Sequence, residues 1–228
     1  MKALFINASP RKNWNTHKML ESALRGAADS GADTELIHLY DLNIKGCVSC
    51  FACKVKNSKT NGLCAYHDAL RPVLESALNS DVVVIGSPIY FSYPTAYARA
   101  FLERFMFPVL SYNVKDSSQE GANVLNRKIA TGTIYTMGYP DEEGIKNFHY
   151  PEFFEETRRF LDLLFGYSET LYAYNTYQFS DYSRYDIAEF IEPMKAKYRD
   201  EHFPQDLQNA FELGKRLVEK AKEFTKGE

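Results

Sequence analysis

The sequence predicts an α/β domain in which helices cover both faces of a mostly parallel β-sheet. Five short apolar segments alternate with segments of helical spacing along the 228 residues, a pattern typical of strands joined by crossover helices. The run Val82-Val83-Val84-Ile85 is apolar without alternation, as expected for a strand buried on both faces. Hydrophobic residues make up 45% of the chain, which allows a sizeable core. We therefore expect a single domain over residues 1–228.

The expected strands are apolar runs that stop at polar residues or at glycine and proline. They cover residues 2–7, 34–39, 82–85, 128–135 and 170–174. The first run ends at Asn7, the third at Gly86-Ser87-Pro88 and the fourth at Met137-Gly138-Tyr139-Pro140. These stops leave polar loops at one end of the expected sheet.

Helices are expected where apolar residues recur at intervals of three and four. These segments are residues 19–27, 67–78, 97–107, 153–165 and 207–224. Gly31 lies beyond the end of the first, and Pro108 closes the third. Two segments fall outside the alternation, a cysteine loop at residues 41–66 and a tyrosine-rich, charged excursion at residues 175–203. We assign both to the same domain.

Charge and hydropathy exclude two classes of partner. The formal net charge of −3 and the sequence pI of about 6.0 argue against a nucleic-acid binder, which would carry a basic face. No stretch approaches the roughly 18 apolar residues of a membrane span. The first residues lead directly into a strand without the layout of a signal peptide. We expect a cytoplasmic protein that binds neither nucleic acid nor membrane.

Three loops are candidates for a ligand site. In open parallel sheets, ligands bind beyond the carboxyl ends of the strands where the strand order reverses, and residues 8–16, 86–94 and 136–142 fall there. The first loop opens a helix, whose free N–H groups suit a phosphate. It lacks the glycine patterns of nucleoside triphosphatases and dinucleotide folds. A compact phosphate bound by side chains and an ordinary turn capped by Asn15 or Thr16 fit this loop equally well.

The second loop favours a planar ligand. It holds Tyr90, Phe91 and Tyr93 at the end of the most buried strand, where aromatic side chains can wall a flat ring. Gly86 and Pro88 shape the backbone so that its amides can face such a ligand. One of the three aromatic residues is expected to belong to the core instead.

Three segments resemble the NADPH-dependent FMN reductase group of the flavodoxin-like superfamily, which includes iron–sulfur flavoproteins. They are Asn7-Ala8-Ser9-Pro10-Arg11-Lys12 with Asn15-Thr16, Gly46-Cys47-Val48-Ser49-Cys50-Phe51-Ala52-Cys53, and Gly86-Ser87-Pro88-Ile89-Tyr90. The resemblance covers residues 1–175. It implies a flavodoxin-like three-layer α/β/α fold whose five-stranded parallel sheet has the order 2-1-3-4-5. Trp14 departs from the family pattern, in which a small residue is common, and residues 175–203 have no counterpart in the smallest members.

The resemblance also implies FMN as cofactor and NAD(P)H as co-substrate. It places the FMN phosphate at Ser9, Arg11, Asn15 and Thr16. It places the isoalloxazine ring against Pro88, Ile89, Tyr90 and Phe91, with Thr136, Met137 and Gly138 on the third loop. It further implies a homodimer or homotetramer in which a neighbouring chain contributes to the flavin site.

These features together predict an FMN-dependent NAD(P)H oxidoreductase. We expect ping-pong hydride transfer from a nicotinamide to a quinone, a dye or another small acceptor, with the cofactor supplying the chemistry. No residue stands out as a proton donor or acceptor, so the catalytic residue is left unassigned. The alternatives are a non-enzymatic electron carrier or redox sensor, which would not oxidise NAD(P)H steadily, and an interaction protein without flavin.

The four cysteines allow three interpretations. The spacing Cys47-x2-Cys50-x2-Cys53-x10-Cys64 could supply four thiolates to an iron–sulfur cluster, but its last gap is longer than in the resembling flavoproteins. Two pairs that share a cysteine suit tetrahedral zinc poorly. Free thiols that pack under the sheet edge are the favoured interpretation. We therefore expect no stoichiometric iron or zinc.

The excursion is unusually aromatic. Seven tyrosine and phenylalanine residues fall between residues 167 and 185, more apolar surface than a solvated loop should expose. We expect this segment to pack against a second subunit and to help close the flavin site, with Tyr177 and Phe179 crossing over. The alternative is that these rings fold back onto their own chain.

Overall fold

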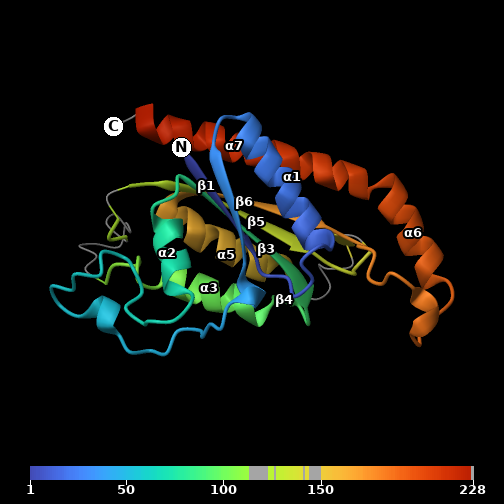
Figure 1. The fold of residues 1–228 in the computed structure, drawn as a ribbon, viewed down its shortest axis with the longest axis horizontal. Coiled ribbons are helices and arrows are strands. Elements are labelled where there is room, and N and C mark those ends of the chain that lie inside the picture. The colour runs from blue at the N-terminus through green and yellow to red at the C-terminus, as the bar shows by residue number, and fades with distance from the viewer. Residues whose placement is uncertain (113–122, 126, 141, 144–149, 227–228) are drawn as a thin grey trace.

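The strands form the predicted parallel sheet. The computed structural model describes residues 1–112, 123–125, 127–140, 142–143 and 150–226. Within these ranges, the strands are β1 Lys2–Asn7, β2 Asp33–His38, β3 Val82–Tyr90, β4 Tyr93–Pro94, β5 Ile129–Thr136 and β6 Gly166–Ala173. Five of them lie parallel in the order β2-β1-β3-β5-β6, and the short β4 pairs antiparallel with β3 (Figure 1). The predicted strand order 2-1-3-4-5 is confirmed.

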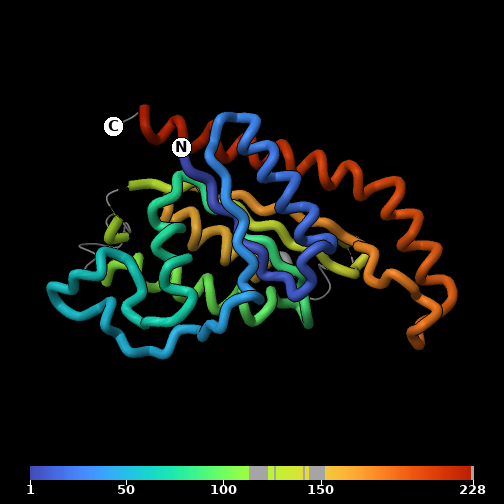
Figure 2. Tube along the Cα trace, in the orientation of Figure 1, coloured from blue at the N-terminus to red at the C-terminus, as the bar shows by residue number. Residues whose placement is uncertain are grey.

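Helices cover both faces of this sheet. They are α1 Asn15–Asp29, α2 Arg71–Leu78, α3 Ala96–Met106, α5 Tyr150–Phe165, α6 Ile191–Glu201 and α7 Phe203–Lys226. Figures 1 and 2 show α1 and the long α7 side by side on one face, with α2, α3 and α5 on the other. Side chains alternate accordingly, since Phe5 packs with Met19 of α1 while Leu4 packs with Phe101 of α3. The two apolar cores therefore lie on opposite faces of the sheet.

β3 is longer than the sequence predicts. We expected it to end at Gly86-Ser87-Pro88, but pairing with β5 continues to Pro88 opposite Thr136, and the strand ends at Tyr90. The expectation was wrong because β5 continues to pair with β3 beyond Gly86. β1 ends opposite Gly86, so that beyond this point β3 has no strand neighbour on the β1 side. Proline is tolerated at such an edge position. Two residues then turn the chain into β4.

The segments outside the alternation contain some regular structure. Short 3₁₀ turns occur at Leu39–Asp41, Ala52–Lys54 and Tyr182–Arg184. The excursion also contains α6, which the sequence analysis did not predict, and Figure 1 shows α6 beyond the end of the sheet, next to the start of α7. None of the described helices is both long enough and apolar enough to cross a membrane.

Candidate functional site

A pocket opens where β1, β3 and β5 end. Its lining mixes polar and apolar side chains around one concave space, as small-molecule sites do. Its lining residues come from the three predicted loops and from the excursion: Ser9, Arg11, Trp14, Asn15, Thr16, Pro88, Ile89, Tyr90, Thr136, Met137, Gly138, Thr176, Gln178 and Phe179. The structure therefore brings together every predicted cofactor-binding residue except Phe91. Residue 141, in the third loop, lies outside the described residues.

The first loop presents a helix N-terminus to this pocket. Its backbone is fixed by local hydrogen bonds, in which the Ser9 amide donates to Asn7 Oδ1 and the Arg11 amide donates to Ser9 Oγ. Trp14 occupies the N-cap of α1 and makes no side-chain hydrogen bond to the helix amides. The alternative in which Asn15 or Thr16 caps the helix is therefore wrong, and the first amides of α1 are left for another acceptor, as at an anion site.

The first and third loops meet through two threonines. Thr16 Oγ1 and Thr136 Oγ1 lie 2.7 Å apart in a buried hydrogen bond, although the two residues are 120 positions apart in the sequence. The third loop is also tied to the residues after β6, because the Met137 amide donates to Ala173 O and Thr176 Oγ1 donates to Met137 O. These bonds join the first loop, the third loop and the residues after β6.

Residues 176–179 of the excursion, which we call the strap, close one side of the pocket. Trp14 Nε1 and Asn15 Nδ2 both donate to Tyr177 O, at 3.0 and 2.8 Å, and Arg11 Nη1 donates to Gln178 O. The sequence analysis expected this segment to help close the flavin site, on the basis of its crowded aromatic residues, but it did not predict that Thr176 and Gln178 line the pocket of their own chain.

The strap lies against its own chain. We expected Tyr177 and Phe179 to cross to a second subunit, but the Tyr177 carbonyl is bound to the first loop and Phe179 lines the chain's own pocket. The neighbouring rings also contact one another, with the ring centroids of Phe179 and Tyr185 only 3.9 Å apart and Tyr182 buried. These rings find partners inside one chain, although Tyr185 stays 50% exposed. The homodimer or homotetramer stays a prediction.

The second loop forms the aromatic rim. Pro88 and Ile89 are half-buried at the end of β3, and the Tyr90 side chain is 49% exposed at the pocket edge. Phe91 and Ser92 form the turn into β4 with φ values of 48° and 74°. Residues other than glycine rarely adopt such positive φ values. The Phe91 side chain is 97% exposed and does not line the pocket.

The electrostatics of the pocket suit an anion. Among the described residues that line the pocket, Arg11 carries the one formal charge, and none is a carboxylate or a histidine. Behind the wall, Lys195 Nζ donates to Gly138 O at 3.0 Å. Burial lowers the pKa of Lys195 to about 8, so this lysine is mainly charged at pH 7. The other polar side chains of the described lining carry hydroxyl, amide and indole groups, which suit a site that positions a cofactor.

A second, smaller pocket lies under the cysteine loop. Cys47, Cys50, Cys53 and Cys64 all line it, against the C-terminal half of α3. Cys47 and Cys50 are exposed, Cys53 is half-buried and Cys64 is buried. Lys54 fastens the loop to the end of α3, because its Nζ donates to the carbonyls of Phe107 and Leu110. All four cysteines therefore contribute to the lining of one pocket.

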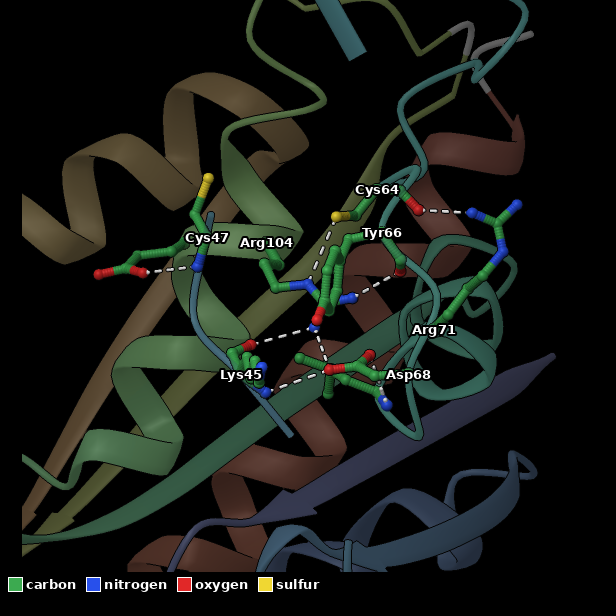
Figure 3. Close-up of polar contacts among 9 residues, drawn as sticks. Lys45, Cys47, Cys64, Tyr66, Asp68, Arg71 and Arg104 are labelled. Atoms are coloured by element: carbon green, nitrogen blue, oxygen red, sulfur yellow. Dashed lines mark hydrogen bonds and ion pairs between the residues drawn. The ribbon is translucent and has the colours of Figure 1, made fainter. Parts of the chain in front are cut away.

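Arg104 anchors this pocket from inside the core (Figure 3). Its fully buried guanidinium donates from Nε to Cys64 Sγ at 3.3 Å and from Nη1 to Asp68 Oδ2 at 2.7 Å. The same group donates to Lys45 O and Tyr66 O, at 3.0 and 2.9 Å. Burial alone would raise the pKa of Asp68, but the hydrogen bond and charge of Arg104, together with hydrogen bonds from the Lys45 and Leu70 amides, hold this pKa below the ordinary value. One side chain thus fixes both ends of the cysteine loop.

The four cysteines line one pocket but are not arranged as a metal site. Among the described residues, no group of three or more histidine, cysteine or acidic side chains could hold a metal ion. Four thiolates are the donor set that a [4Fe–4S] cluster requires. The four cysteines around one pocket meet that requirement in kind and number.

A family model and several curated proteins match the chain. The model of the NADPH-dependent FMN reductase family matches residues 1–138. An iron–sulfur flavoprotein of Archaeoglobus fulgidus is 30% identical over 153 residues, which are 61% of this chain and 67% of that protein. An iron–sulfur flavoprotein of Methanocaldococcus jannaschii is 32% identical over 104 residues, 46% of this chain and 51% of that protein. The matched region thus spans two thirds of one relative and about half of the other.

Solved structures share the fold. An NAD(P)H:quinone oxidoreductase from Methanothermobacter marburgensis superposes with a TM-score of 0.63 at 15% identity, over 95% of this chain and 96% of that one. An azoreductase from Bacillus anthracis gives a TM-score of 0.57 at 13% identity, over 95% and 99% of the two chains. At this level of identity the comparisons show a common flavodoxin-like architecture and nothing about the ligand.

Proposed function

The chain belongs to the family of NADPH-dependent FMN reductases. We propose that it is an FMN-dependent NAD(P)H oxidoreductase whose flavin binds in the pocket at the ends of β1, β3 and β5. The observation that carries this proposal is the convergence of three loops, far apart in sequence, on one pocket with a helix N-terminus and a single arginine. This pocket lies where the strand order reverses, which is where open α/β sheets bind ligands.

We assign the phosphate to the α1 end of the pocket. The uncapped amides of α1 and the side chains of Ser9, Arg11, Asn15 and Thr16 form a donor set for an anion. The isoalloxazine ring would lie toward Pro88, Ile89 and Tyr90, with Thr136, Met137 and Gly138 opposite. We leave Phe91 out of this set because its side chain points into solvent.

The chain's own residues bind, orient and shield. When bound, FMN supplies hydride chemistry that no side chain can supply. The strap and the rim at Tyr90 would keep water from two sides of the pocket, while the hydrogen bond between Thr16 and Thr136 keeps the first and third loops in register. A nicotinamide and an electron acceptor would use the remaining open side in turn, which is the ping-pong order.

We propose a small acceptor such as a quinone or an azo dye. Two solved structures of the same fold carry the names quinone oxidoreductase and azoreductase, which supports this class. An electron carrier would instead pass electrons only to a partner protein. Steady NADPH oxidation with a soluble quinone supports the reductase, and a single turnover per chain supports the carrier.

Replacing Arg11 by alanine should weaken FMN binding about tenfold or more, because a hydrogen bond to a charged group contributes roughly 1.5–3 kcal/mol. Fluorescence titration of the apoprotein measures the dissociation constant. The same substitution should weaken the binding of riboflavin, which lacks the phosphate, much less. Lys12→Ala is the matched control, since Lys12 lies on the same loop but pairs with Asp41 outside the pocket. Equal losses for FMN and riboflavin would show that Arg11 acts only through the strap.

We propose a second cofactor site at the cysteine loop. The spacing favoured free thiols, but four cysteines around one pocket and relatives named iron–sulfur flavoproteins support a cluster held by Cys47, Cys50, Cys53 and Cys64. Such a site would pass single electrons and would favour a carrier role alongside the reductase.

Metal analysis of anaerobically purified protein should find about four iron atoms and equal acid-labile sulfide per chain, the content of one [4Fe–4S] cluster. Cys64→Ala should reduce this content strongly while FMN binding persists, because the two pockets share no lining residue. Protein without iron and with four titratable thiols would contradict the cluster and support free thiols, which the cysteine spacing favours.

A further inference from the structure

Lys195 is a buried cation placed behind the proposed flavin pocket. It lies on α6 within the excursion, and its side chain is 4% exposed. Its Nζ donates to Gly138 O at 3.0 Å, to Asn175 Oδ1 at 3.1 Å and to Thr176 O at 3.4 Å. Three hydrogen bonds satisfy the donors of the ammonium group, but all three acceptors are neutral.

The charge of Lys195 has no counter-ion in the described part of the chain. Its neighbour on the same helix, Lys197, pairs with Glu201, whereas Lys195 takes part in none of the ion pairs between described residues. The pKa of about 8 reflects burial alone, with no opposing carboxylate. A buried charge without a partner is costly, and such groups concentrate at functional sites.

Two of the three acceptors belong to the pocket wall. Gly138 and Thr176 both line the pocket, and a Cβ atom at Gly138 would come within 3.7 Å of Lys195 Nζ. The ammonium group is therefore separated from the pocket by little more than one layer of backbone. Because Lys195 is buried, the field of this charge is screened less than that of a surface lysine.

We propose that Lys195 is a positioning residue that fixes the third loop and holds a positive charge against the flavin ring, so that the reduced ring is favoured over the oxidised ring. This inference rests on the proposed FMN site. Oxidised flavin is neutral at its ring, whereas reduced flavin can carry a negative charge there. A nearby cation therefore stabilises the reduced form more and raises the midpoint potential of the bound flavin.

A purely structural role predicts a different result. If Lys195 only braced Gly138 and Thr176, its loss would weaken the binding of oxidised and reduced flavin equally, and the midpoint potential would not move. Lys195→Gln separates the two roles, because glutamine can still donate to the same carbonyls but carries no charge. Lys195→Arg keeps the charge. Lys197→Gln is the matched control, since Lys197 lies two residues away on α6 with its side chain 72% exposed.

The test is a reductive titration of the FMN-loaded protein, followed at the flavin absorbance against a reference dye. Lys195→Gln should shift the ratio of oxidised to reduced flavin about tenfold, which is about −30 mV for a two-electron couple. The midpoint potential of the Lys195→Arg variant should lie close to that of the wild type, and the potential of Lys197→Gln should equal it. A Lys195→Gln potential equal to that of the wild type would overturn the inference. Wild-type protein that takes up no FMN would instead overturn the proposed function.

Discussion

Replacing Arg104 by leucine is expected to lower the free energy of unfolding by about 3–5 kcal/mol, the usual cost of removing one partner of a buried ion pair. The substitution removes the guanidinium from Asp68, whose side chain is only 13% exposed, and leaves Lys45 O and Tyr66 O without a donor. Urea unfolding, followed by circular dichroism, measures this loss. The same change should loosen the cysteine loop, because Cys64 Sγ loses its donor.

The loss should depend on pH in a defined direction. The pKa of Asp68 lies below its ordinary value of 3.8, so its ionised form stabilises the folded protein above that pH, and this contribution disappears as the pH falls through the folded-state pKa. The difference between wild type and Arg104→Leu should therefore shrink in acid. Arg158→Leu is the control, since its ion pair with Glu155 is partly exposed and should contribute less than about 1 kcal/mol. An Arg104 variant as stable as this control would contradict the network in Figure 3.

Replacing Gly214 by alanine is expected to destabilise the protein by about 3 kcal/mol, the upper end of ordinary overpacking. Helix propensity alone predicts the opposite, a gain of about 1 kcal/mol. The packing of α1 on α7 reverses the sign, because a Cβ atom at Gly214 would lie 1.9 Å from Ala23 O and 3.0 Å from Ala27 N. These atoms belong to the backbone of α1, so the helices must separate.

The same substitution should also affect the flavin pocket. α1 carries Asn15 and Thr16 at its N-terminus, so that displacing this helix is expected to weaken FMN binding as well. Asn209→Ala, at an exposed position of α7, is the control and should change stability by less than about 0.5 kcal/mol. Stability at or above the wild-type value in Gly214→Ala would refute the close approach of the two helices.

The sequence predicts the sheet well because buried parallel strands are continuous apolar runs. Val82–Ile85 lies in the middle of the sheet as expected, and the strand order is confirmed. The end of β3 was misjudged because Gly86 and Pro88 resemble a stop, and only the tertiary pairing with β5 shows that the strand continues. α6 was missed because its apolar spacing is weak among charged residues.

The pocket was predicted from the positions of three loops. The part of its lining that this prediction lacked comes from the excursion. Ser9, Thr16 and Thr136 lie together because the fold forces the ends of β1 and β5 to one edge. The strap could not be predicted in the same way, since the direction of an irregular segment depends on contacts such as that of Trp14 with Tyr177 O. The cysteine spacing likewise gave no information on Arg104, which lies far along the sequence and orients Cys64 from α3.

The absorption spectrum of the purified protein tests the flavin site most directly. Apoprotein is mixed with one equivalent of FMN without oxygen, passed through a desalting column and then treated with NADPH. We expect the eluted protein to retain the flavin bands and NADPH to bleach them, with Arg11→Ala retaining less flavin than Lys12→Ala. Wild-type protein that leaves the column colourless would contradict an FMN site at the ends of β1, β3 and β5.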